Sequence, residues 1–189
     1  MPYTYGTPEW EEAFVKKTKE RIEAAEQPLI CFSPEWMGMW EKLLQGDAKY
    51  KEVAKNWEGS VILHIQKNSE LGVDQDIFVW MDLWHGDCKS LRYVPREVGE
   101  KGDFVITGTL ERWISVGKKQ LDPVKGMMQG KLKLKGDLPT IVRNVKAAMR
   151  LVETCAEVGG KFPDELSKEE VEKFRGIVKE LTTEFSITS

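Results

Sequence analysis

The sequence predicts an α+β fold, because the spacing of its apolar residues changes from a helical period to a strand period and back. Residues 7–57 and residues 138–184 carry apolar side chains at intervals of three and four, which is typical of amphipathic helices. Residues 60–66 alternate with a period of two, and residues 77–84 are apolar on both faces. The chain should therefore form a central sheet with helices before and after it.

The predicted helices of the N-terminal part begin at a repeated signal, a capping residue followed by a proline. This signal stands at Thr7-Pro8 and again at Ser33-Pro34. A side-chain oxygen at the first position accepts a backbone N–H, and proline fits the first helical position because its φ is already helical. Asp47 should cap a third helix, which ends near residue 59.

Three strands are expected after this helical part. In residues 60–66, Val61, Leu63 and Ile65 form one face. Residues 77–84 should be covered on both faces, because both are apolar. Residues 86–102 predict a turn, a short strand near residues 91–94 and a loop. Residues 104–107 continue the sheet, and Thr109 should cap a helix that ends at Gly117.

Residues 117–137 combine a turn, a strand and a helix start. Asp122-Pro123 predicts a short helix ending at Gly130. The next five residues alternate lysine and leucine, which predicts a strand with its lysines on one face and its leucines on the other. Asp137 should then cap a single helix over residues 138–152.

The C-terminal residues follow a break at Gly159-Gly160. Ser167 and Glu170 have the spacing of a capping box, so a last helix should begin there. We predict one domain over residues 1–158 and a helical appendage over residues 159–189, either packed on that domain or exchanged with a second copy.

Composition narrows the classes of partner. The chain has 28 Lys and Arg against 31 Asp and Glu, a net charge of -3, which argues against nucleic-acid binding. Its three cysteines, Cys31, Cys88 and Cys155, are widely spaced, which argues against a disulfide framework and a zinc site. The start of the chain lacks a basic and apolar leader, and no long apolar run follows, so we expect a cytoplasmic protein.

Catalytic, cofactor and metal sites are not indicated by the sequence. Cys88 lies close to His85 and Asp87, but neighbours in a turn seldom orient one another, so turn chemistry is the better interpretation. His64 and His85 are far apart, which makes a metal site improbable. Asp82 interrupts an apolar strand face and either holds a ligand's polar end or bonds to the backbone.

One stretch resembles a known family. Gly117-Lys118, Leu121-Asp122-Pro123, a Met-rich turn and then the sequence GKLKLKGD at residues 130–137 are similar to the last third of a sterol carrier protein 2 (SCP-2) domain of the stand-alone prokaryotic type. Residues 57–65, 76–84 and 103–109 resemble the first three strands of that domain. The resemblance extends over residues 45–152.

This resemblance implies an SCP-2-like fold. It has a mixed, mainly antiparallel sheet of about five strands, covered by helices that enclose an apolar cavity, here with extra helices at both ends. It also implies a lipid-binding or lipid-transfer protein that holds a fatty acid, a fatty acyl-CoA, a phospholipid or a sterol-like ligand without covalent chemistry. The residues expected to line the cavity are Trp36, Met37, Trp40, Met81, Leu83, Trp113, Ile114, Met127, Met128, Leu132, Leu134, Ile141, Val145 and Met149.

Two further features leave alternatives open. Many members of the family have a Phe where this chain has Gly126-Met127-Met128, so the pocket and its ligand are expected to differ. A basic cluster is formed by Lys118, Lys119, Lys125, Lys131, Lys133 and Lys135. It either attracts an anionic head group, an acyl-CoA phosphate or a transient membrane surface, or it is a solvated strand face.

The apolar stripes also fit other functions. Because such stripes usually form the core of their own domain, the chain is alternatively a non-enzymatic accessory or dimerisation domain with a filled core, working as a homodimer or as the partner of an enzyme. An acyl-CoA hydrolase or transferase is a weaker alternative, since no set of acid, base and nucleophile is recognisable.

Overall fold

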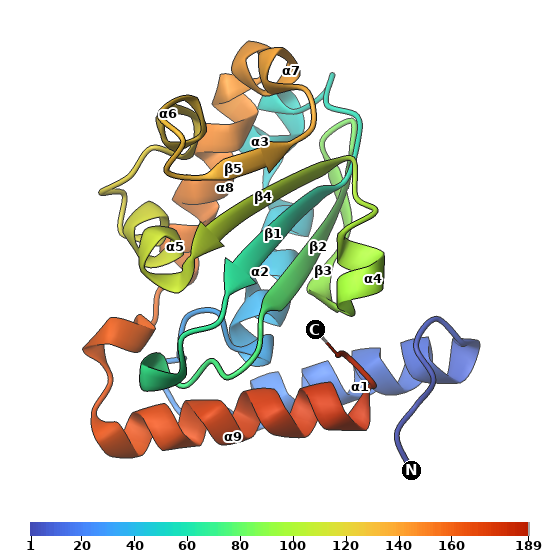
Figure 1. The fold of residues 1–189 in the computed structure, drawn as a ribbon. Coiled ribbons are helices and arrows are strands. Elements are labelled where there is room, and N and C mark those ends of the chain that lie inside the picture. Colours follow the sequence, from blue (N-terminus) through green and yellow to red (C-terminus); the bar gives the residue numbers. More distant parts are fainter. Residues whose placement is uncertain (189) are drawn as a thin grey trace.

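The computed structural model describes residues 1–188, and these residues form the predicted α+β fold around a five-stranded sheet (Figure 1). The strand order is β3-β2-β1-β4-β5. Central β1 pairs antiparallel with β2 and parallel with β4, so the sheet is mixed, and its other pairs are antiparallel. The strands are β1 (Val61–Gln66), β2 (Ile77–Trp84), β3 (Asp87–Val94), β4 (Phe104–Thr109) and β5 (Lys133–Lys135).

Helices precede, interrupt and follow the sheet. They are α1 (Pro8–Ala24), α2 (Pro34–Gly46), α3 (Ala48–Val53), α4 (Arg96–Gly99), α5 (Leu110–Gly117), α6 (Pro123–Met128), α7 (Leu138–Arg143), α8 (Val145–Val158) and α9 (Lys168–Glu184). Short 3-10 turns are η1 (Ser69–Leu71) and η2 (Pro163–Glu165). In Figure 1, α2, α3 and α8 lie behind the sheet, and α4 lies in front of β2 and β3. The predicted five-stranded mixed sheet, with helices over it and extra helices at both ends, is confirmed.

The capping signals place the helix starts as expected. The Thr7 hydroxyl accepts the Trp10 N–H at 3.2 Å, and the Ser33 hydroxyl accepts the Trp36 N–H at 3.2 Å. At the last helix, Ser167 and Glu170 form the predicted capping box. These local bonds satisfy N–H groups that have no partner within the helix.

The strand register gives the sheet two different faces. Alternate β1 residues such as Val61 and Leu63 belong to the main core, which contacts the helices behind the sheet. The intervening Ile62 packs with Phe78 and Val105 in a smaller core on the opposite side. We call these the inner face and the outer face. Strand β2 is buried along its inner face, but on the outer face only Phe78 is buried and Trp84 is 48% exposed, so the predicted cover on both faces holds only for the start of the strand.

Four boundaries differ from the predictions. Helix α3 ends at Val53 instead of near residue 59, because the chain enters a turn at Ala54. Strand β3 begins at Asp87, because pairing with β2 extends it beyond the expected residues 91–94. Strand β5 begins at Lys133, because the Lys131 and Leu132 N–H groups donate to the Gly126 carbonyl at 2.8 and 3.1 Å instead of to β4. The single helix expected over residues 138–152 is divided into α7 and α8 at Asn144.

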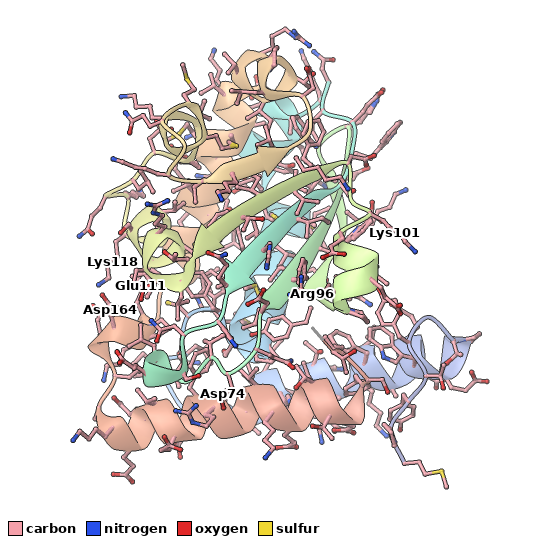
Figure 2. All side chains as sticks on the ribbon, viewed as in Figure 1. Asp74, Arg96, Lys101, Glu111, Lys118 and Asp164 are labelled. Atoms are coloured by element: carbon pink, nitrogen blue, oxygen red, sulfur yellow. The ribbon has the colours of Figure 1, made fainter. Side chains whose placement is uncertain are left out.

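The segment after α8 is fixed to several parts of the molecule. Trp10 of α1 donates its indole N–H to the Phe185 carbonyl at 2.8 Å, and the Phe185 ring packs edge-on against Trp10 and Phe14. Lys118 at the end of α5 pairs with Asp164 at 2.9 Å (Figure 2). In Figure 1, α9 and α1 lie together at one end of the molecule. The division at residue 158 and an exchange between copies stay predictions.

Candidate functional site

An apolar cavity of about 100 Å³ lies between the inner face of the sheet and its covering helices. Its lining residues are Phe32, Trp40, Tyr50, Trp57, Val61, Leu63, Met81, Leu83, Ile106, Trp113, Val116, Gly117, Pro123, Met127, Ile141, Asn144, Ala147, Ala148, Leu151, Val152 and Cys155. The sheet therefore supplies one wall, and helices α2, α3, α5, α6, α7 and α8 supply most of the other.

The periods of the elements explain which residues reach the cavity. Val61 and Leu63 of β1 and Met81 and Leu83 of β2 are spaced by two, which places them on one face of the sheet. On α8 the lining positions recur at intervals of three and four, which places them on one side of the helix. The methyl side chain at Ala147 fills little of the distance between helix and sheet, so space remains there.

The tryptophans around the cavity direct their polar atoms elsewhere. The indole N–H of Trp40 donates to the Thr154 hydroxyl at 3.0 Å, and that of Trp113 donates to the His64 carbonyl at 3.1 Å. The indole N–H of Trp57 donates to the Gly59 carbonyl at 2.8 Å. A buried N–H that already has its acceptor makes no demand on a ligand. These rings therefore offer carbon atoms to whatever enters.

The ionisable groups of the lining are neutral near pH 7. Burial raises the pKa of Cys155 to about 12, and the neighbouring Cys31 adds to that rise. Burial also raises the pKa of Tyr50. No Lys, Arg, Asp or Glu is among the described residues that line the cavity. The interior therefore favours an uncharged, apolar group, because burying an unpaired charge there would be costly.

The structure brings six of the fourteen expected lining residues to the cavity, namely Trp40, Met81, Leu83, Trp113, Met127 and Ile141. The others lie elsewhere. Trp36, Met37, Ile114 and Leu132 are buried in the main core without lining the cavity, and Leu134 and Met149 are partly buried. Met128 and Val145 are exposed. A role of any of the fourteen in lipid binding stays a prediction.

Several lining residues were missed in the sequence. The alternation that identifies β1 also places Val61 and Leu63 on one face, so they were within reach of pattern analysis. Tyr50 and Trp57 stand on the predicted stripe of the third helix, but nothing in that stripe separates core from cavity. Ala147 could not be recognised as a lining residue from the sequence, because its small side chain contributes by leaving space between helix and sheet.

The candidate nucleophile is not arranged for catalysis. The Cys88 thiol donates to the Ser90 carbonyl at 3.5 Å, and burial raises its pKa to about 12, with the charges of Glu41 and Asp82 adding to the rise. His85 lies 2.7 Å from Glu58 instead. Asp82 lies between two cavity residues of β2, so its side chain points away from the cavity.

Residues 1–188 contain neither a cluster of metal ligands nor a helix that could span a membrane. No group of three or more His, Cys, Asp or Glu side chains in this part of the chain is placed to hold a metal ion. No helix within the same residues is long and apolar enough to cross a membrane.

Comparison with known proteins places these observations in a family. Residues 40–149 match the SCP-2 sterol transfer family. A crystal structure of sterol carrier protein 2 is 32% identical, with a TM-score of 0.62, and the match covers 68% of this chain and 98% of that one. The solution structure of a conserved hypothetical protein from Thermus thermophilus, described as possibly a sterol carrier protein, is 31% identical. Its TM-score is 0.62, and the match covers 72% of this chain and 94% of that one. A search of curated sequences found no significant match. The chain belongs to the SCP-2 sterol transfer family.

Proposed function

We propose that this protein binds a lipid in the apolar cavity and transfers it without covalent chemistry. The observation that carries the proposal is the uncharged lining between the inner face and the helices, in which even the tryptophan N–H groups bond away from the interior. Membership of the SCP-2 sterol transfer family supports the same function.

The chemistry of the lining defines the part of the ligand that enters. An acyl chain or a sterol-like ring system is matched to carbon walls, whereas a carboxylate or phosphate would lose its hydration there. The proposed ligand is therefore a fatty acid, a fatty acyl-CoA, a phospholipid or a sterol-like molecule, with its polar group outside the cavity. The two methionines of the Gly126-Met127-Met128 turn differ in position, and Met127, which lines the cavity, is the proposed source of this chain's ligand preference.

The expected affinity suits a carrier that must release its cargo. Each methylene group that enters contributes about 0.8 kcal/mol before the costs of association, and a cavity of about 100 Å³ admits only part of an acyl chain. After those costs, micromolar or weaker binding is expected.

The direct test is extraction of the purified protein with organic solvent and mass spectrometry of the extract, followed by titration with a fluorescent fatty acid and a fluorescent acyl-CoA. We expect a co-purified lipid, saturable binding, or both. If neither is found, lipid binding is refuted. A stable dimer in sedimentation together with that result would favour the accessory or dimerisation function. Turnover of an acyl-CoA that disappears in Cys88→Ala would instead support an enzyme.

A pair of variants connects binding to the cavity. Ala147→Phe places a ring in the cavity and should weaken binding of the fluorescent fatty acid about tenfold or more, the loss expected when over about 1.4 kcal/mol of apolar contact is displaced. Ala156→Phe makes the same change at an exposed position of the same helix and should bind like wild type. Equal binding by both variants would place the ligand elsewhere.

A further inference from the structure

Positive charge is concentrated in one continuous part of the chain. Residues 123–150 contain seven Lys and Arg and one Asp, a net charge of +6, whereas the rest of the chain carries -9. This part comprises α6, β5, α7 and the first turns of α8. Figure 1 places α6 and α7 at the end of the molecule opposite α1 and α9. The protein is therefore electrically asymmetric in spite of its small total charge.

Much of this positive charge is available to a partner. Lys125, Lys131, Lys133 and Lys146 are exposed, and within residues 1–188 none of them forms a salt bridge. Arg150 differs, because its guanidinium is already paired with Asp47, Glu153 and Glu157. Free ammonium groups at this density attract an anionic surface.

Large apolar side chains are exposed in the same region. Met128 of α6, Val142 of α7 and Val145 of α8 are 66%, 43% and 40% exposed. The three helices contact one another pairwise, so these residues share one end of the domain. We call these three residues with the four lysines the basic-apolar surface. Apolar side chains among lysines are the combination that enters the boundary between lipid head groups and acyl chains.

The same helices separate the cavity from solvent. Pro123 and Met127 of α6, Ile141 of α7 and Ala147 of α8 line the cavity, while their neighbours Met128, Val142 and Lys146 point outward. Each helix therefore has one side on the cavity and one side on the basic-apolar surface. A layer that touched this surface would lie one helix away from the proposed ligand.

We propose that the basic-apolar surface docks on a bilayer of anionic phospholipid, with Met128, Val142 and Val145 at the head-group boundary and the lysines at the phosphates. Docking rests on the proposed function, since it gives the lipid a short path between bilayer and cavity. A bilayer fits better than an acidic protein, because the exposed apolar side chains are dispersed among cations over three helices.

The test measures co-sedimentation of the full chain with vesicles of phosphatidylcholine and with vesicles that also contain phosphatidylglycerol. Wild type should bind the second kind only, and binding should weaken in high salt because salt screens exposed charges. Lys125→Glu with Lys146→Glu should lower vesicle affinity about tenfold or more, because each lysine near an anionic surface contributes about 1 kcal/mol. Val142→Asp should also weaken binding.

The controls stand at the opposite end of the molecule. Lys16→Glu with Lys19→Glu makes the same charge change on exposed positions of α1, and Val15→Asp matches Val142→Asp at a valine that is 52% exposed. Both controls should bind vesicles like wild type. Equal losses in the α1 variants, or equal binding to both kinds of vesicle, would overturn the proposed surface.

Titration with the fluorescent fatty acid in the absence of vesicles separates docking from cargo binding. Every surface variant should keep wild-type binding there, and circular dichroism should give wild-type melting curves. Saturable fatty-acid binding without any binding to phosphatidylglycerol vesicles would refute docking and leave the proposed function intact. Vesicle binding without binding of any lipid ligand would refute the proposed function and leave docking intact.

Discussion

The two faces of the sheet are covered in opposite ways. On the inner face, carbon atoms of the sheet and helices surround a cavity, and the polar atoms bond elsewhere. On the outer face, Ile62, Phe78 and Val105 form a closed core with charged and polar side chains beside it. The same strand, β1, serves both, because its residues alternate between the faces. One sheet therefore forms the wall of an apolar cavity on one face and a closed core with polar side chains beside it on the other.

The polar connections of the outer face centre on Asp76. Its carboxylate lies 2.8 Å from His64 Nε2 and accepts an N–H of Arg96 at 2.9 Å. His64 also lies 2.9 Å from the Thr107 hydroxyl and stacks on Phe78. Arg96, on the side of the sheet nearest the viewer in Figure 2, lies 5.1 Å over the Phe78 ring. This network ties β1, β4 and α4 together where no large helix covers the sheet.

The largest expected difference between the faces is in their tryptophans. Trp113→Ala removes a buried ring from the inner face and should lower the free energy of unfolding by about 3–5 kcal/mol, because atoms are lost and an enlarged cavity stays behind. Trp84, on the outer face, has a ring that is 48% exposed. Trp84→Ala should therefore change the free energy of unfolding by about 0.5 kcal/mol or less. Urea unfolding followed by circular dichroism measures both. Similar losses would mean that the faces do not differ as described.

Most of the fold could be predicted because its signals are local. Capping at Thr7, Ser33 and Ser167 depends on neighbouring residues, and so does the alternation in β1. The limits of β5 could not be predicted, because the Gly126 carbonyl takes two N–H groups that a strand would have used. The break at Asn144 was also missed, since the apolar stripe continues through it.

The candidate site was only partly predictable, because a cavity is a property of packing. Met127 and Met128 are adjacent and chemically identical, yet one lines the cavity and the other is exposed. The resemblance to the family predicted both as lining residues. Ala147 and Ala148 could not be predicted as lining residues, since they contribute by leaving space next to the sheet.

Two buried alanines on the inner side of the sheet differ in the space around them. Ala54→Leu inserts atoms into filled core and should lower the free energy of unfolding by about 1–3 kcal/mol, because overpacking displaces neighbours. Ala147→Leu inserts the same atoms next to the cavity. It should change the free energy of unfolding by less than about 1 kcal/mol, since the new methyl groups enter free space and make apolar contacts. Both values come from urea unfolding. Equal destabilisation by the two variants would mean that the cavity is closed to side chains in solution.

The smallest effect concerns Asp76 on the outer face. Its burial would raise the pKa, but the hydrogen bonds from His64 and the Lys67 N–H and the charge of Arg96 outweigh this, so the pKa lies below its ordinary value. The ionised form therefore stabilises the fold above the unfolded pKa of about 3.9, and this contribution is lost as the pH falls through the folded value.

Asp76→Asn should accordingly lower the free energy of unfolding by about 1 kcal/mol at neutral pH, where the network is partly exposed and screened. The gap between wild type and variant should close in acid as wild-type Asp76 takes up its proton. Urea unfolding at a series of pH values measures this gap. Asp82→Asn is the control, because Asp82 lies on the same strand face and has no side-chain hydrogen bond or ion pair within the described residues. A gap that stayed constant in acid would show that the Asp76 charge does not support the outer face. The contrast between the uncharged cavity wall and the charged outer face would then rest on the cavity alone.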